Sequence, residues 1–204
     1  MILKIHRDNP NNREIKQVVE CLKDGGVIVY PTDTVYGIGC DIFNKKAVER
    51  VAKIKGINIK KNNFSFICSD LSHISNFTKQ IHTPTYKLMK RNLPGPFTFI
   101  LNANNNIPKL FKTNKKTIGI RVPNHNIPIE IVSQLGNPII TSSVKDDDKI
   151  LEHSTDPSLI YEKLKYIVDI VIDGGYVGTE ASTIVDCTKS EFEIIREGKG
   201  NLIF

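Results

Sequence analysis

The chain has 204 residues, of which 40% are apolar and 25% are charged, and tryptophan is absent. This composition fits a folded globular protein with a sizeable core and excludes a disordered chain. The formal net charge of +6 permits a polyanionic partner such as RNA or a nucleotide, although it is also typical of a lysine-rich solvated surface. No stretch approaches the roughly 20 apolar residues of a membrane span, and the N-terminus has no signal-peptide pattern. We therefore expect one domain over residues 1–204, located in the cytoplasm and without a membrane partner.

Apolar periodicity predicts helices and strands along most of the chain. The first helix signal begins after Asn11 or Asn12, has apolar residues at i, i+3, i+4 and i+7 from Ile15, and is ended by the glycines at 25–26. Residues 144–153 show no pattern and are expected to form a mobile surface loop. The other predicted elements are strands over 2–6, 27–30, 64–68, 97–101, 117–123, 138–143, 167–172, 182–185 and 192–195, helices over 44–56, 84–91, 128–135 and from 156–157, a short helical turn capped by residues 69–70, and a helical turn over 107–111.

Helices and strands alternate at first and extra strands follow, so the sequence predicts an α/β fold with a single twisted open mixed sheet and helices packed on it. Polar residues recur where the predicted strands end, and strand ends of open α/β sheets are where ligands bind. If these ends converge, they form a hydroxyl-rich pocket with two arginines, which suits an anionic ligand. The residues concerned are Thr32, Thr34, Arg121, Thr141, Ser142, Ser182, Thr183 and Arg196.

Residues 25–40 hold the densest of these polar groups. Residues 27–30 are rich in β-branched side chains and predict a strand buried on both faces, which Pro31 ends. Residues 31–39 contain two threonines, one carboxylate, one tyrosine and two glycines. Either an ordinary turn uses these side chains on its own backbone, or the segment is one wall of a ligand site.

The four cysteines at 21, 40, 68 and 187 form no CxxC pair and have no zinc-like spacing with the five histidines. We expect reduced core cysteines and no structural metal. The sequence also lacks the GxxxxGK[ST], GxGxxG and HExxH motifs, so it predicts neither a P-loop, a dinucleotide fingerprint nor a zinc protease.

Five segments nevertheless resemble, in the right order, the pattern of the YrdC/YciO family. Residues 31–40 (PTDTVYGIGC) resemble its PT[DE]TVYGLG signature, and residues 94–99 (PGPFTF) resemble its PGPxT segment. Three further segments that match are 118–123 (IGIRVP), 182–186 (STIVD) and 195–198 (IREG). Residues 63–68 (NFSFIC) and 173–176 (DGGY) are similar to the YciO branch, which is the closer match.

The resemblance implies a YrdC-like domain with a basic concave surface. It also implies the activity of the YrdC branch, which makes L-threonylcarbamoyl-AMP from L-threonine, bicarbonate and ATP, with Mg²⁺ on the triphosphate, for the N6-threonylcarbamoyladenosine modification of tRNA. Family members are also associated with double-stranded RNA binding. By motif position, the residues expected to bind threonine are Thr34, Arg121, Ser142 and Ser182, those expected near the nucleotide are Lys55, Thr117 and Arg196, and those expected on an RNA-binding surface are Lys53, Lys60 and Lys61.

Two positions depart from the pattern of the synthase branch. That branch has Lys-x-Arg-Pro after the second helix, whereas here Lys55 is followed by Gly-Ile-Asn, so Ile57 replaces the arginine. It also has Ser-Ala-Asn where this chain has Ser142-Ser143-Val144. Each missing group would face ATP, and losing a charge-assisted contact costs about 1.5–3 kcal/mol.

Three functions therefore stay open. The first is the synthase reaction, which needs no protein nucleophile. The second is a module that binds structured RNA through its phosphates, with weak or no synthase activity. The third keeps the pocket but gives it another nucleotide or a carboxylated metabolite as ligand, because a fold does not fix a function.

Overall fold

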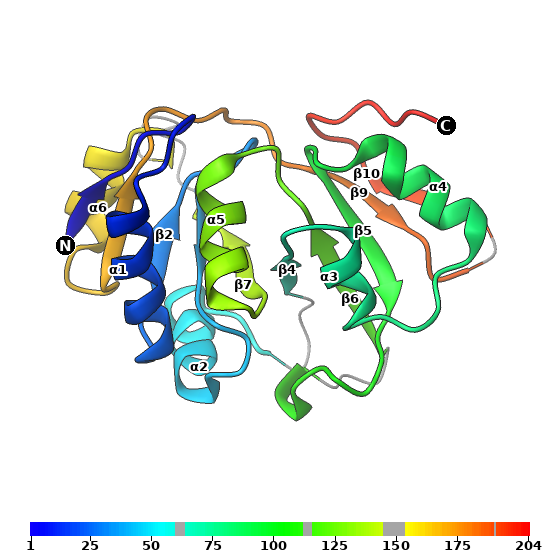
Figure 1. The fold of residues 1–204 in the computed structure, drawn as a ribbon, viewed down its shortest axis with the longest axis horizontal. Coiled ribbons are helices and arrows are strands. Elements are labelled where there is room, and N and C mark those ends of the chain that lie inside the picture. The colour runs from blue at the N-terminus through cyan, green and yellow to red at the C-terminus, as the bar shows by residue number, and fades with distance from the viewer. Residues whose placement is uncertain (60–63, 112–115, 145–153, 190) are drawn as a thin grey trace.

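The structure is a computed structural model that describes residues 1–59, 64–111, 116–144, 154–189 and 191–204. In this part of the chain, ten strands form one open sheet in the order β1-β8-β2-β3-β7-β4-β6-β5-β9-β10 (Figure 1). Parallel and antiparallel pairs both occur, so the predicted mixed α/β sheet is confirmed. The strands are β1 Ile2–Lys4, β2 Ile28–Tyr30, β3 Gly37–Gly39, β4 Ser65–Ile67, β5 Phe97–Asn102, β6 Thr117–Arg121, β7 Ile139–Ser143, β8 Ile170–Asp173, β9 Thr183–Asp186 and β10 Glu193–Arg196.

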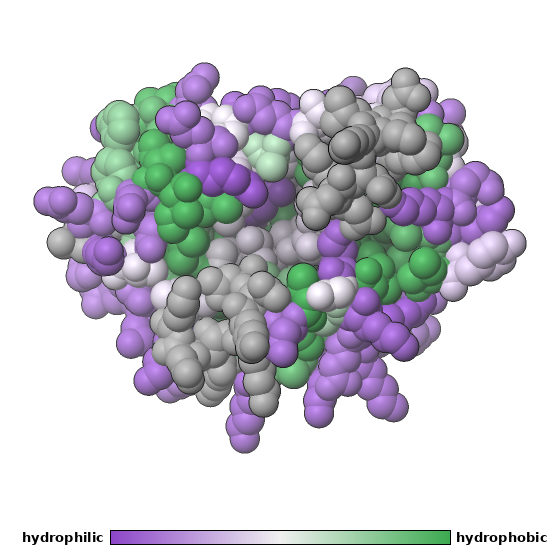
Figure 2. Space-filling model, turned by 180° about the vertical axis from the view of Figure 1, so that it is seen from behind, coloured by the Kyte–Doolittle hydropathy of each residue, from purple (hydrophilic) through white to green (hydrophobic). Residues whose placement is uncertain are grey.

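Most described helices cover one face of the sheet. Figure 1 shows α1, α5, α3 and α4 on the near side, with α1 and α5 next to each other, whereas α6 packs against β8 at one end of the sheet. The opposite face is hollowed near its middle, where the surface is pale and weakly polar (Figure 2). The helices are α1 Asn12–Lys23, α2 Lys45–Ile54, α3 Leu71–Ser75, α4 Thr83–Asn92, α5 Asn126–Leu135 and α6 Pro157–Leu164, with a 3₁₀ turn over Lys109–Phe111. None of the described helices is long and apolar enough to cross a membrane.

The first helix illustrates why the sequence folds as predicted. Asn11 caps α1 by accepting a hydrogen bond from the backbone N–H of Arg13. The apolar face that begins at Ile15 is buried against the sheet, and Gly25 follows the helix with a positive φ of 86°. Similarly, Asn44 caps α2 by accepting from the N–H of Ala47.

Two elements differ from the prediction. Strand β3 was expected to be a loop because Gly37-Ile38-Gly39 has little β-propensity, yet it pairs with β2 on one side and β7 on the other. The glycines fit there because a Cβ at Gly39 would collide with the carbonyl oxygen of Ile140 on β7. Strand β8 begins at Ile170 and not at Ile167, because Arg50 binds the carbonyl of Ile167 and the carboxylate of Asp169.

Some predictions fall outside the described residues. These are Lys60 and Lys61, and the loop expected over 144–153 apart from Val144, which is buried. Lys53 is exposed on α2.

Candidate functional site

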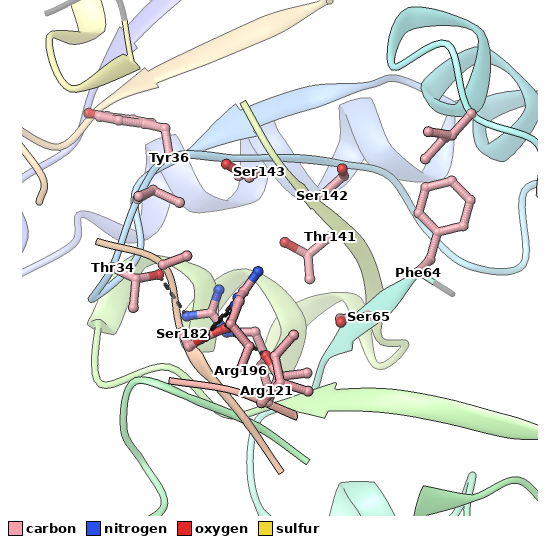
Figure 3. Close-up of a pocket in the computed structure, with 16 residues that line it drawn as sticks. Thr34, Tyr36, Phe64, Ser65, Arg121, Thr141, Ser142, Ser143, Ser182 and Arg196 are labelled. Carbon is pink, nitrogen blue, oxygen red and sulfur yellow. Dashed lines mark hydrogen bonds between the residues drawn. The ribbon is translucent and has the colours of Figure 1, made fainter. Parts of the chain in front are cut away.

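A pocket of about 310 Å³ lies where several strand ends and loops meet (Figure 3). Its walls are formed by the loop after β2, by the strands β4, β5, β6 and β7, and by the segment that leads through β9 to β10. The described residues that line it are Thr34, Val35, Tyr36, Gly37, Ile57, Phe64, Ser65, Thr98, Arg121, Thr141, Ser142, Ser143, Ala181, Ser182, Ile184 and Arg196. Six of the eight polar residues at predicted strand ends line this pocket, whereas Thr32 and Thr183 do not, so the predicted convergence is confirmed for those six. Five of the seven residues assigned to threonine or nucleotide share the pocket.

The other two residues lie elsewhere. Lys55 caps the C-terminus of α2 and lines a separate cavity with Val144 and Lys163. Thr117 begins β6, four residues before Arg121, and alternation along the strand places both side chains on the same face of the sheet. Four residues of strand span about 13 Å, so Thr117 lies on the pocket's face of the sheet but outside the pocket.

Arg121 is the most constrained cation of the pocket. Its side chain is 8% exposed, and its Nη2 donates to Asp33 Oδ1 at 2.9 Å and to Thr34 Oγ1 at 3.0 Å. Burial lowers the pKa of Arg121 below its usual value, and the Asp33 carboxylate acts in the opposite direction. The Arg121 Nε is buried and has no hydrogen-bond partner among the described residues, so it is a donor available to a ligand.

The hydroxyl of Thr34 supports Arg121. Thr32 Oγ1 lies 2.6 Å from the Val35 carbonyl oxygen. Because a carbonyl oxygen can only accept, the Thr32 hydroxyl must donate its proton to it. In the 3.0 Å contact between the two threonine hydroxyls, Thr34 must therefore be the donor. Thr34 Oγ1 thus donates to Thr32 and accepts from Arg121, and it has one lone pair left for a ligand's donor such as an ammonium group.

Arg196 and Ser182 form the opposite wall. Arg196 donates through Nε and Nη2 to the carbonyl of Ser182, at 3.2 and 2.7 Å. The Ser182 Oγ lies 2.8 Å from the hydroxyl of Thr98 on β5. Burial lowers the pKa of Arg196, and no carboxylate pairs with its guanidinium among the described residues. It is therefore the uncompensated positive charge of the pocket.

The far end of the pocket is apolar. Figure 3 places Phe64 at the opposite end from Thr34 and Arg121. Ile57 lines the pocket at the position where the synthase branch has arginine, and Val144, which replaces the asparagine, is buried against the cavity beside Lys55. The described lining therefore offers no cation in place of the missing arginine.

Sequence reasoning missed several residues of the site. Ser65 lies within the NFSFIC segment that resembles the YciO branch, and this resemblance was the available signal for it. Thr98 lies within the PGPFTF segment that matches the family, and this match was the available signal. Tyr36 joins the pocket to the segment after β8, because its hydroxyl donates to the Gly175 carbonyl at 2.8 Å. Burial raises the pKa of Tyr36, so the hydroxyl stays protonated.

Comparison with known proteins identifies the family. A family model named Sua5_yciO_yrdC and described as "Telomere recombination" matches residues 20–198. The chain belongs to the Sua5/YciO/YrdC family. An uncharacterized protein of Haemophilus influenzae is 43% identical over 200 residues, which cover 97% of this chain and 95% of that protein. The crystal structure of E. coli YciO matches with a TM-score of 0.91 and 38% identity, over 98% of this chain and 97% of YciO.

Family members that carry an activity or a ligand in their names are more distant. The threonylcarbamoyl-AMP synthase of Coxiella burnetii is 36% identical over 135 residues, which cover 66% of this chain and 72% of the synthase. P. abyssi Sua5 in complex with L-threonine matches with a TM-score of 0.87 and 25% identity, over 97% of this chain and 57% of the Sua5 chain. The Sua5/YciO/YrdC fold and the predicted resemblance to YciO are confirmed, while threonine is known here as the ligand of Sua5.

Proposed function

We propose that this member of the Sua5/YciO/YrdC family binds L-threonine in the pocket and makes L-threonylcarbamoyl-AMP from it with bicarbonate and ATP. The observation that carries the proposal is the buried Arg121, which lines a pocket rich in hydroxyl groups and whose Nε has no hydrogen-bond partner among the described residues. An α-carboxylate suits such a donor, because charge-assisted hydrogen bonds to arginine are strong. The synthase of Coxiella burnetii and the threonine complex of P. abyssi Sua5 support the same substrate.

The reaction requires positioning more than a protein nucleophile. The threonine amine would attack bicarbonate and release water to give a carbamate. An oxygen of the carbamate would then form a bond to the α-phosphorus of ATP as the bond to the leaving pyrophosphate breaks. Arg121 and the hydroxyls of Ser142 and Ser182 would hold the amino acid in place. Arg196 would neutralise charge that develops on the phosphate, and Mg²⁺ would arrive with the triphosphate.

The described lining fits the amino acid better than the triphosphate. Besides Arg121, only Arg196 provides a cation in it, and Lys55 lines another cavity. We therefore expect weaker ATP binding than in the synthase branch. The product, L-threonylcarbamoyl-AMP, would serve the modification of adenosine in tRNA.

A pyrophosphate-release assay with L-threonine, bicarbonate and ATP tests this function. We expect release that depends on threonine and that falls at least tenfold in Arg196→Gln, because the substitution removes the uncompensated charge. Lys189→Gln, which changes an exposed cation outside the pocket lining, serves as the matched control. If no threonine-dependent release is seen at an enzyme concentration where a synthase-branch enzyme is active, the proposal is wrong.

A second candidate function is binding of structured RNA, supported by the net charge of +6 and by exposed lysines such as Lys53 on α2. Affinity should then fall steeply with salt, because phosphate contacts release counterions. Charge reversal at Lys53, Lys60 and Lys61 should weaken binding further. Absence of binding at low salt would exclude this function.

A further inference from the structure

Asp33 is a buried carboxylate that lies directly behind Arg121. The side chains of both residues are 8% exposed, and Asp33 does not line the pocket. One Asp33 oxygen accepts from Arg121 Nη2 and the other accepts from the backbone N–H of Asn124, both at 2.9 Å. Asp33 therefore ties the loop after β2 to the loop after β6 and fixes the guanidinium between them.

This arrangement also sets the charge of the pocket. The described residues in and directly behind its lining include two guanidinium groups, of Arg121 and Arg196, and one carboxylate, of Asp33. Asp33 offsets the charge of Arg121, which leaves the guanidinium of Arg196 as the uncompensated charge of the described lining. The ammonium group of Lys199 donates to the backbone carbonyl of Asp33, but Lys199 is exposed and lies outside this lining. Such a site favours a ligand with a single anionic group and disfavours a dianion, whose second charge would meet the Asp33 carboxylate at low dielectric.

We infer that Asp33 is the positioning residue that makes this pocket selective for a single carboxylate, as in a zwitterionic amino acid, and keeps phosphate groups out of the amino-acid end. The inference rests on the proposed function in naming L-threonine as the amino acid. Asp33 acts in two ways: it fixes the guanidinium of Arg121, which lines the pocket, and it offsets the charge of that guanidinium.

The test compares Asp33→Asn with Asp41→Asn. Asp41 is also buried, and its oxygens accept from the Phe43 N–H and the Asn137 amide, away from the pocket. L-Threonine and inorganic phosphate are titrated separately into each folded protein by calorimetry. In Asp33→Asn we expect threonine binding to weaken about tenfold, because the guanidinium of Arg121 loses the carboxylate that fixes it. Phosphate binding should strengthen about tenfold, because a negative charge is removed a few ångströms from the ligand. Asp41→Asn should change neither by more than about twofold, as is usual for a distant site.

Opposite shifts for the two ligands support the inference, because a merely structural role would weaken both. The inference is wrong if Asp33→Asn behaves like Asp41→Asn, or if it weakens both ligands alike. Should Asp33→Asn fail to fold, Asp33→Glu serves instead, because it keeps the charge but changes the geometry. Phosphate binding must then stay as weak as in the wild type while threonine binding weakens. Stronger phosphate binding in Asp33→Glu would overturn the inference. If the wild-type protein binds no threonine, the proposed function fails, whereas stronger phosphate binding in Asp33→Asn still supports the role of Asp33.

Discussion

Replacing Thr34 by valine tests whether the Thr34 hydroxyl holds Arg121 in place. Valine has the same shape as threonine but lacks the hydroxyl. Thr34 is fully buried, so no water can replace the lost group. The substitution deletes the bond that Thr34 donates to Thr32 and the bond that it accepts from Arg121, both 3.0 Å long.

The expected cost follows from these two bonds. A neutral hydrogen bond contributes about 0.5–1.5 kcal/mol, and one to a charged group about 1.5–3 kcal/mol. Arg121 Nη2 keeps its bond to Asp33, so it is not left unpaired, and the lower half of each range applies. We expect the free energy of unfolding to fall by about 2–3 kcal/mol. Threonine binding should weaken by about tenfold, because the guanidinium loses one of its two anchors.

Denaturant unfolding and calorimetric titration with L-threonine measure the two effects. Thr78→Val is the matched control, because Thr78 is also buried and its hydroxyl donates to the Ile74 carbonyl at 3.3 Å, outside the pocket. The control should lose about 1 kcal/mol of stability and no affinity. If Thr34→Val is no less stable than Thr78→Val, or binds threonine as the wild type does, the assigned role of Thr34 is refuted.

Three further predictions concern other positions. Ile57→Arg should strengthen ATP binding by about 10- to 100-fold in calorimetric titrations, because it supplies the missing charge-assisted contact. An unchanged affinity would contradict the explanation that the pocket binds ATP weakly because Ile57 replaces an arginine. Gly39→Ala should destabilise the protein by more than about 2 kcal/mol in denaturant unfolding, because the new methyl group collides with the Ile140 carbonyl, so a neutral result would disprove the collision. Burial, aided by Arg7, lowers the pKa of His125 from 6.5 to about 4. As the pH falls, the unfolded chain therefore binds the proton before the folded protein does. The free energy of unfolding should decrease by up to about 3 kcal/mol between about pH 6.5 and about pH 4. His125→Asn keeps a capping side chain and should flatten this part of the stability profile measured against pH; an unchanged profile would exclude His125 as its source.

The sequence predicted the elements better than their arrangement. The helix α1 has caps and an apolar face within a dozen residues, so local physics determines it. Strand β3 could not be predicted, because Gly37-Ile38-Gly39 becomes a strand only through pairing with β2 and β7. The pairing order itself depends on contacts between residues more than 100 positions apart, and these leave no periodic signal.

The same limit applies to the pocket. Polar residues at predicted strand ends included Thr34, Arg121, Ser142, Ser182 and Arg196, and all five line the pocket. Strand direction does not explain why they meet, because β6 is parallel to β4 whereas β7 is antiparallel to it. For Ser65 the only signal was the resemblance of its segment to the YciO branch, because a serine inside an apolar strand has no pattern of its own. Asp33 was noted only as a carboxylate near threonines, and its pairing with Arg121 requires the loop after β2 to meet the end of β6.

The position of β8 between β1 and β2 has a consequence for how the protein is made. Residues 2–4 and 28–30 are synthesised before the strand that pairs with both, Ile170–Asp173, which follows β2 by about 140 residues. Until β8 is made, both strands have unpaired backbone groups on the sides that β8 will occupy, which are sites for association between nascent chains. The first strand can therefore join the sheet only after β8 has been synthesised, and this edge of the sheet is expected to be where folding slows and chaperones bind.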